Sequence, residues 1–405
     1  MADHDLSRVP LGDELYERAL RLIPMGTQTN SKRPPEALRG AYPPFVARGQ
    51  GAYVWDLDGN RYVDCKLGCG PVILGHAYPA VSQAVKARID EGTVYGSAHP
   101  SEVTLAELLV EVIPCAEMVR FLKTGAEGMA AAVRLARAHT GRELVLSRGY
   151  HGWADWSLAK NADVGGIPAC LRDLTLDVGF GDYEALERLF AARGEEVAAF
   201  TFAAPYDADP LAVLRFAQRL RELTHKSGAL LIFDEIVTGF RVALGGLQEY
   251  SGVVPDLAVF SKALANGFPL AAVAGRADIM HLWERTRVSS TFGGDTTAIA
   301  AAIACVQELR QKGVPAVIAR RGEWFGREVV SLAQEAGFAM EQMGFGGLPY
   351  LKPVGADAAR ATDLHRALLL EGIMPYFPLW FLSYSHDETV LGEVLTAFRR
   401  ALRRL

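Results

Sequence analysis

The chain has 405 residues, half of them hydrophobic and 22% charged, and its formal net charge is −5. This length has room for a large core and two or three lobes, because single cores stop growing near ~250–300 residues. The mild acidity argues against nucleic acid or an anionic membrane as a partner. No apolar run reaches the ~18 residues of a membrane span, and residues 1–5 carry no basic leader, so we expect a cytoplasmic protein.

The five cysteines are scattered through the chain. Cys65 and Cys69 are closest together, but no second Cys or His pair lies near them in the sequence. A structural zinc site needs four such ligands. We therefore expect reduced thiols and no metal.

The N-terminal part begins with a predicted amphipathic helix over residues 12–22. Prolines block helix formation in the loop that follows, residues 25–35. This loop carries Lys32 and Arg33, which could contact an anionic substrate group or belong to a solvated connection. Further on, two alternating runs within residues 45–64 flank the turn sequence Asp58-Gly59-Asn60 and predict a β-hairpin.

Helices are predicted over residues 80–91 and 101–112, and a short strand over 119–122. That strand runs into the small-residue turn 123–128, after which an alanine-rich helix continues to Thr140. The free N–H groups and the positive end of a helix dipole can hold a phosphate. The segment fits neither the Walker A motif nor the dinucleotide fingerprint, so an ordinary turn remains the alternative.

The next strand, residues 144–147, leads to Gly149-Tyr150-His151-Gly152-Trp153. An aromatic ring presented by flanking glycines suits stacking on a flat cofactor, although a packed loop aromatic explains it equally well. Strand 197–202 and helix 210–227 continue the strand–helix alternation. Such repeats predict a mainly parallel sheet that is covered by helices on both faces.

Two polar residues, Asp234 and Lys262, follow predicted buried strands. The apolar run 230–233 ends at Asp234, and the run 257–260 ends just before Lys262. Ligands of open α/β sheets bind at the carboxyl ends of such strands. A poorly solvated lysine has a lowered pKa and favours the nucleophilic amine, and a carboxylate can keep a pyridine nitrogen protonated. The two residues together indicate pyridoxal phosphate (PLP), whereas either alone would be unremarkable.

A hydroxyl-rich turn, residues 289–297, precedes a predicted helix that begins near Ala298. It could contact a phosphate or serve as an ordinary helix cap. The remaining tail mixes helices with short strands.

Taken together, these segments resemble the class III, or ω, aminotransferases of PLP fold type I, most closely the glutamate-1-semialdehyde 2,1-aminomutase-like subgroup. The resemblance covers roughly residues 12–310. It rests on Thr124-Gly125-Ala126-Glu127, Tyr150-His151-Gly152, Asp234-Glu235-Ile236, Thr238-Gly239-Phe240-Arg241, Lys262 and Thr291.

The resemblance implies an α/β fold with a large domain, built on a mainly parallel seven-stranded sheet sandwiched by helices, and a smaller α+β domain from both termini. We expect boundaries at 1–65 for the N-terminal segment, 66–305 for the PLP-binding domain and 306–405 for the C-terminal part.

The resemblance also implies roles for individual residues. Lys262 is expected to form the Schiff base with the cofactor and Asp234 to bind its pyridine nitrogen. The backbone N–H groups of Gly125 and Ala126 are expected to bind the phosphate, Tyr150 to stack on one face of the ring and Ile236 to contact the other. His151 is a further expected contact from the same loop as Tyr150. Thr291 is expected to reach the phosphate of the neighbouring subunit. Lys32, Arg33 and Trp153 are the substrate candidates.

The implied activity is amino-group transfer between an amino acid or amine and a carbonyl substrate, by a ping-pong mechanism through pyridoxamine phosphate, in a homodimer with shared sites. Two departures bear on the substrate: Ala204 stands where the family usually has glutamate, and Asp295-Thr296 where Asn-Pro is common. The lost glutamate, the loop of residues 28–33 and the pair Trp153 and Trp156 favour a biosynthetic aminotransferase over the standard aminomutase. An aminomutase, a racemase or epimerase, and a PLP-binding protein without turnover remain the alternatives.

Overall fold

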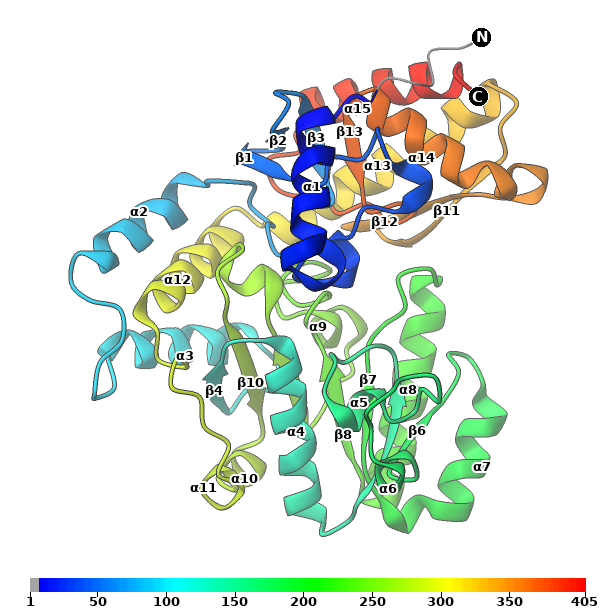
Figure 1. Ribbon diagram of the computed structural model, residues 1–405. Coiled ribbons are helices and arrows are strands. Elements are labelled where there is room, and N and C mark those ends of the chain that lie inside the picture. Colours follow the sequence, from blue (N-terminus) through cyan, green and yellow to red (C-terminus); the bar gives the residue numbers. More distant parts are fainter. Residues whose placement is uncertain (1–6) are drawn as a thin grey trace. The chain divides into compact units, whose positions relative to one another are not determined.

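The computed structural model describes residues 7–405, so the leaderless start predicted for residues 1–5 lies outside it. The chain divides into two compact units (Figure 1). We call residues 79–316 the large unit, and residues 7–78 with 317–405 the small unit. The domain boundaries predicted from the sequence, 65/66 and 305/306, remain a prediction.

The large unit is built on a seven-stranded sheet with the strand order β4-β10-β9-β8-β7-β5-β6. The five strands from β9 to β6 in that order are parallel to one another. β10 is antiparallel to both of its neighbours, β9 and β4. The predicted α/β architecture with a mainly parallel seven-stranded sheet is thereby confirmed. The strands are β4 (Met118–Leu122), β5 (Leu144–Arg148), β6 (Thr175–Asp177), β7 (Val197–Phe202), β8 (Leu230–Asp234), β9 (Leu257–Phe260) and β10 (Ala271–Gly275).

The interior strand β7 shows why the sheet needs helices on both faces. All six of its residues are buried. Ala199 belongs to the core cluster formed with α4, whereas the ring of Phe202 lies 5.6 Å from that of Phe216 on α8. Since alternate residues of a strand point to opposite faces, each face of β7 contacts its own helix layer.

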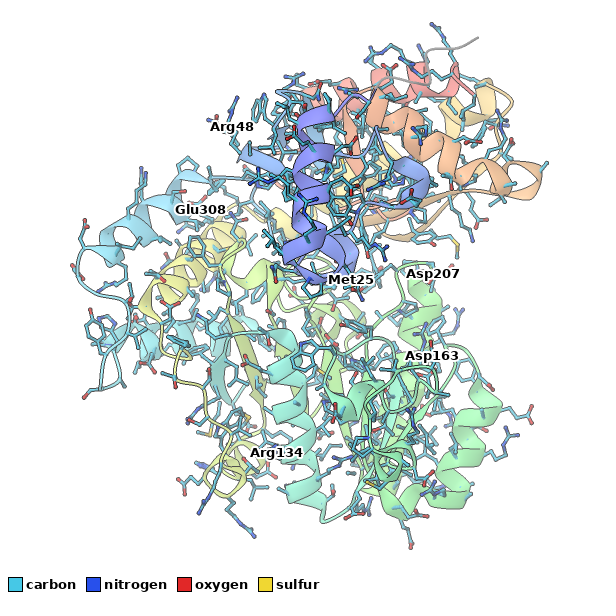
Figure 2. All side chains as sticks on the ribbon, in the orientation of Figure 1. Met25, Arg48, Arg134, Asp163, Asp207 and Glu308 are labelled. Carbon is cyan, nitrogen blue, oxygen red and sulfur yellow. The ribbon has the colours of Figure 1, made fainter. Side chains whose placement is uncertain are left out.

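Helices surround this sheet, and α4 shows how they are patterned. On α4, Met129 is buried and Arg134 is exposed (Figure 2). The α-helices of the large unit are α2 (Pro79–Ile89), α3 (Pro100–Val112), α4 (Gly125–Thr140), α5 (Asp155–Leu158), α6 (Ala169–Arg172), α7 (Tyr183–Arg193), α8 (Pro210–Ser227), α9 (Leu247–Ser251), α10 (Ala277–Met280), α11 (Trp283–Thr286) and α12 (Thr296–Gln311). Two 3₁₀ turns, η4 (Gly194–Glu196) and η5 (Lys262–Ala265), complete the unit.

The small unit has a four-stranded sheet in the order β1-β2-β3-β13. The predicted hairpin is confirmed, since β2 and β3 pair antiparallel. β13 comes from the other end of the chain and pairs parallel with β3. The strands are β1 (Val46–Gln50), β2 (Tyr53–Asp56), β3 (Arg61–Cys65) and β13 (Ile373–Pro375), and a separate ribbon contains β11 (Met340–Phe345) and β12 (Leu348–Pro353).

Three helices of the C-terminal part and strand β3 share one core in the small unit. Phe325, Leu364 and Phe398, each on a different helix, are fully buried in it together with Trp380. The helical elements are α1 (Pro10–Leu22), η1 (Pro24–Gly26), η2 (Asn30–Lys32), η3 (Glu36–Leu38), α13 (Val314–Glu335), η6 (Gly355–Arg360), α14 (Ala361–Leu370) and α15 (Glu388–Leu402), of which α13 begins in the large unit. Within residues 7–405, no helix combines the length and the apolar character needed to cross a membrane.

Candidate active site

Asp234 and Lys262 lie at the same edge of the large unit's sheet. Asp234 is the last residue of β8, and it is in register with Val259 of the parallel strand β9. β9 ends at Phe260, and Lys262 follows at the start of η5. The sheet therefore brings a carboxylate and an amine to the carboxyl ends of neighbouring parallel strands.

Asp234 is only 7% exposed, yet both of its carboxylate oxygens are engaged. Oδ2 lies 2.7 Å from Nδ1 of His151, and Oδ1 accepts a hydrogen bond of 3.1 Å from the N–H of Ile236. His151 itself is completely buried, and its ring stacks on that of Trp156 at 6.0 Å. A carboxylate held in this way is oriented by its neighbours and shielded from water.

The contact between His151 and Asp234 depends on small residues. His151 follows β5, and β7 separates β5 from β8 in the sheet. At the end of β7 stands Ala203, and a Cβ on Gly149 would lie 2.7 Å from the Cβ of Ala203. The loop can cross the end of β7 only because Gly149 has no side chain and adopts a positive φ of 106°. Ala204, where the family usually has glutamate, is buried beside this crossing.

The turn from β4 into α4 presents free backbone donors. A capping box closes the start of the helix: Thr124 Oγ1 accepts from the N–H of Glu127, and the Glu127 carboxylate accepts from the N–H of Thr124. Within residues 7–405, no group accepts a hydrogen bond from the N–H of Gly125 or Ala126. These two donors and the helix dipole suit an anion such as a phosphate.

Two further glycine contacts bring the predicted residues together. A Cβ on Gly125 would lie 2.4 Å from Cδ1 of Ile236, and one on Gly152 would lie 2.5 Å from the Cβ of Ala126. The loop that carries His151 and the turn after Asp234 therefore both approach the N-terminus of α4. Tyr150, on the same loop, is 70% exposed and makes its ring available for stacking.

Lys262 has an unusual backbone conformation. Its φ is +41°, in the left-handed region that non-glycine residues seldom occupy. Such conformations cost on the order of 1–3 kcal/mol and occur often at functional sites. The preceding residue is fixed as well, because the hydroxyl of Ser261 donates a 2.7 Å hydrogen bond to the carbonyl of Leu270.

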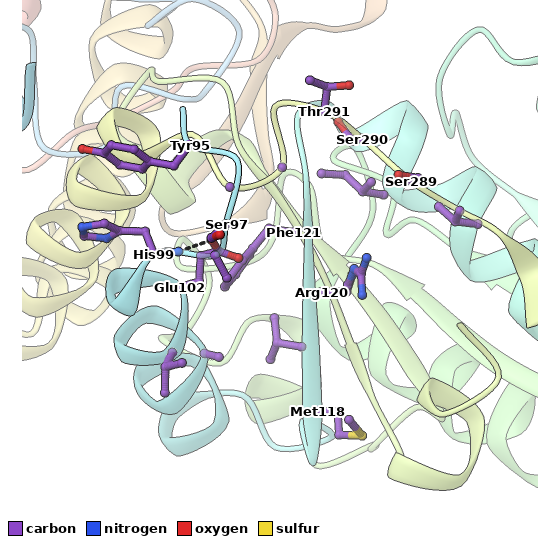
Figure 3. Close-up of a pocket in the computed structure, with 18 of the residues that line it drawn as sticks. Tyr95, Ser97, His99, Glu102, Met118, Arg120, Phe121, Ser289, Ser290 and Thr291 are labelled. Carbon is purple, nitrogen blue, oxygen red and sulfur yellow. Dashed lines mark hydrogen bonds between the residues drawn. The ribbon is translucent and has the colours of Figure 1, made fainter. Parts of the chain in front are cut away.

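Thr291 lies elsewhere on the large unit, on a loop that borders a cavity of about 790 Å³ (Figure 3). The cavity is lined mainly by the segment 94–99, by α3 and β4, and by residues 288–294, and it includes none of the other predicted cofactor residues. A partly buried ion pair supports the loop: Lys123 Nζ lies 2.9 Å from Oδ2 of Asp295. Burial opposes ionisation of Asp295, but hydrogen bonds from Thr297 and Lys123 hold its pKa below the usual value.

The three substrate candidates belong to both units. Lys32 and Arg33 are exposed residues of the small unit, and Trp153, in the large unit, is 76% exposed. Trp153 and Trp156 lie close together in the sequence, but of the two only Trp156 stacks on the buried His151 ring. This contact was missed because the sequence does not indicate which of the two tryptophans faces inward. Within residues 7–405, no group of His, Cys, Asp and Glu side chains could hold a metal ion.

Comparison with known proteins identifies the family of this chain. The family model described as aminotransferase class-III matches residues 38–341, about three quarters of the chain. The FumI protein of Sphingopyxis sp. MTA144, solved in a PLP internal aldimine form, is 28% identical, with a TM-score of 0.89 over 97% of this chain and 96% of that one. An omega-transaminase from Sphaerobacter thermophilus is 29% identical, with a TM-score of 0.85 over 97% of each chain.

A glutamate-1-semialdehyde aminomutase from Pseudomonas aeruginosa PAO1, in complex with PMP, shares the fold at 21% identity, with a TM-score of 0.85 over 98% of this chain and 95% of that one. The site fits the group that these relatives bind, since a helix N-terminus suits its phosphate and a buried carboxylate suits its ring nitrogen. The cofactor is pyridoxal 5′-phosphate. The chain belongs to the class III aminotransferase family and is a PLP-dependent enzyme of that kind.

Proposed function

We propose that the chain is an aminotransferase that moves an amino group from an amino acid or amine to a carbonyl substrate in two half reactions, by a ping-pong mechanism. The observation that carries this proposal is the buried His151–Asp234 pair beside the free N–H groups of Gly125 and Ala126. The similarity to a transaminase at 29% identity supports it further. The biosynthetic role expected from the sequence is part of the same proposal.

Bound PLP supplies an electron sink that stabilises negative charge at the substrate Cα. In our proposal Asp234 keeps a proton on the ring nitrogen, and His151 holds the carboxylate in place. Gly125 and Ala126 donate their N–H groups to the phosphate, while Tyr150 and Ile236 contact opposite faces of the ring. These residues orient the cofactor and exclude water from its inner edge.

Lys262 has two tasks in this proposal. Its Nζ would hold the cofactor in the resting enzyme. Once free, its amine would act as the base that moves a proton at the substrate Cα. The rigid backbone around Lys262 supports this assignment, because a base must hold its position while it moves a proton.

The proposal includes a homodimer in which Thr291 contributes to the neighbouring subunit's phosphate site. Thr291 is exposed on the loop that borders the cavity of Figure 3. Val94, Val103 and Val110, which also line it, are more than 40% exposed. Exposed apolar residues that gather on one surface favour a protein partner. Sedimentation at micromolar concentration should give twice the chain mass, and a monomer that still turns over would contradict shared sites.

The experiment that tests the function is the absorption spectrum of the purified protein with PLP, followed through additions of amino donors and then of carbonyl acceptors. We expect a visible cofactor band that an amino donor removes and a carbonyl acceptor restores. Lys262→Ala should lose this band and the exchange, while the exposed control Lys226→Ala should keep both.

Each other outcome assigns a different function. Isomerisation of one amino substrate without an added acceptor would show an aminomutase. Interconversion of enantiomers would show a racemase, and a band that no amine changes would show a binding protein without turnover. If added PLP gave no band, the assignment of the site itself would be wrong.

A further inference from the structure

A largely buried lysine of the large unit anchors the start of the loop 149–153, which we call the cofactor loop. Lys160 follows α5 closely, and its side chain is only 9% exposed. Its Nζ donates to the carbonyl of Gly149 at 2.6 Å, to Oδ1 of Asp177 at 2.7 Å and to Oγ of Ser147 at 3.1 Å. An ammonium group has three N–H donors, so every one of them has an acceptor.

The cofactor loop depends on such side-chain anchors. Within residues 7–405, no residue of this loop takes part in a backbone–backbone hydrogen bond. Backbone groups that are not paired in this way must be satisfied by side chains or by water. In the described chain, Lys160 donates to the carbonyl of Gly149, and His151 holds the middle of the loop through Asp234. These two side chains are therefore the polar anchors of the loop.

The backbone on both sides of Lys160 is itself held in place. Arg172, on α6, donates to the carbonyls of Ala159 and Asn161, at 3.3 and 2.8 Å. A side chain that starts from a fixed backbone loses less conformational freedom when it reaches its partner. Lys160 is therefore a firm support for the cofactor loop.

The alternative is that Lys160 only connects β5 to β6. Ser147 and Asp177 are register partners in these parallel strands, but the sheet already pairs them. The Asp177 side chain is 54% exposed, and ion pairs with exposed carboxylates contribute little to stability. The shortest of the three bonds goes to Gly149, at the base of the loop. That bond is the one whose effect the strand pairing does not duplicate.

We propose that Lys160 is a positioning residue of the cofactor site, which fixes the base of the cofactor loop and thereby the positions of Tyr150 and His151. This inference rests on the roles proposed above for those two residues. Without the ammonium group, the loop would keep a single polar anchor and would adopt more conformations. Ordering the loop when PLP binds would then reduce the affinity for the cofactor.

The test is titration of the apo protein with PLP, a measurement that needs no amino transfer. Lys160→Met keeps most of the apolar stem of the side chain and removes the ammonium group. We expect its PLP dissociation constant to rise about 10-fold to 100-fold, the range that loss of a hydrogen bond from a charged donor implies. The induced circular dichroism of the cofactor at saturating PLP should change as well, because Tyr150 and His151 are then less ordered beside it.

Two variants of the same cluster separate positioning from stability. Ser147→Ala and Asp177→Asn each alter one partner of Nζ and leave its bond to Gly149. Ser147→Ala should lower the melting temperature, yet both variants should bind PLP within about 3-fold of wild type. Lys226→Met, at an exposed site, should match wild type in both measurements. Wild-type PLP affinity in Lys160→Met would overturn the proposal, as would losses of affinity in all cluster variants that only follow their losses of stability.

A further variant decides the question if Lys160→Met does not fold. Lys160→Gln has a shorter, neutral side chain whose amide has only two N–H donors, so its PLP dissociation constant should rise at least about 3-fold. An unchanged value would overturn the proposal.

The binding measurement also separates this inference from the proposed function. If Lys160→Met weakens PLP binding to a protein whose bound cofactor no amine changes, the aminotransferase proposal fails while the positioning role stands. If wild type and variants exchange amino groups equally well and bind PLP equally tightly, the positioning role fails while the aminotransferase proposal stands. Both fail if the wild-type protein binds no PLP.

Discussion

Nδ1 of His151 lies 2.7 Å from Oδ2 of Asp234, and both side chains are buried at the end of the large unit's sheet. Removing the imidazole would leave a buried carboxylate without its main donor, which raises its energy and frees it to rotate. We expect His151→Phe to fold, because the ring volume is kept. Its amino-transfer rate should fall about 10-fold to 100-fold, and its affinity for PLP should fall as well.

Stopped-flow measurement of the first half reaction checks this prediction. Asp234→Asn should be slower still, by about 10²-fold to 10³-fold, the range found when one preorganised electrostatic group is lost from an active site. His225→Phe, at an exposed position near the end of α8, serves as the control. A His151→Phe enzyme with the wild-type rate would show that the pair has only a structural role.

Gly152→Ala should damage the phosphate site through the backbone. Gly152 has a φ of +96°, and a Cβ there would lie 2.5 Å from the Cβ and 2.9 Å from the Cα of Ala126. The substitution combines backbone strain with displacement of the N-terminus of α4, at a cost of about 1–3 kcal/mol. We expect at least a 10-fold loss in PLP affinity, measured by titration of the apo protein. Gly165→Ala, where a Cβ would meet nothing within 4 Å, should bind PLP normally.

Lys123→Met should loosen the loop that carries Thr291. The variant leaves the partly buried Asp295 carboxylate without its cation, and we expect the free energy of unfolding to fall by about 1–2 kcal/mol. If Thr291 completes a neighbouring subunit's site, the dimer dissociation constant should rise together with the PLP dissociation constant. Sedimentation and PLP titration, with Lys226→Met as the control, measure both. A lower free energy of unfolding with unchanged dimer and PLP dissociation constants would show that the ion pair has only a local structural role.

Glu235 predicts a pH-dependent stability. It is fully buried, and burial raises its pKa to about 7, although Thr238 and the N–H groups of Leu247 and Gln248 donate to it. Because the folded pKa lies above the unfolded value of ~4.3, the stability that the protonated carboxyl contributes is complete below about pH 4 and is lost as the pH rises through 7. The loss amounts to about 4 kcal/mol.

Urea unfolding at several pH values checks this prediction. The stability of wild type relative to Glu235→Gln should fall between about pH 4.5 and pH 7.5, whereas Glu284→Gln, at an exposed position, should follow wild type. Parallel pH profiles for wild type and Glu235→Gln would show that Glu235 is ionised with no cost in the folded protein.

The sequence by itself determined much of this protein because the relevant signals are local. Alternating strands and helices predicted the covered parallel sheet, and the turn at Asp58-Gly59-Asn60 predicted the hairpin of β2 and β3. Asp234 and Lys262 could be singled out because each follows an apolar run that can only be a buried strand. The N-terminus of α4 was visible as a strand, a small-residue turn and a helix in succession.

Only the tertiary structure decided which distant residues meet. β10 runs antiparallel to its two neighbours, and β13 pairs with β3 from the far end of the chain, although neither direction nor partner is written in a strand's own residues. His151 reaches Asp234 across the end of β7 because Gly149 and Ala203 leave room. Burial and electrostatic pairing depend on the whole fold, so the charge state and the contacts of such a residue cannot be predicted from its neighbours in sequence.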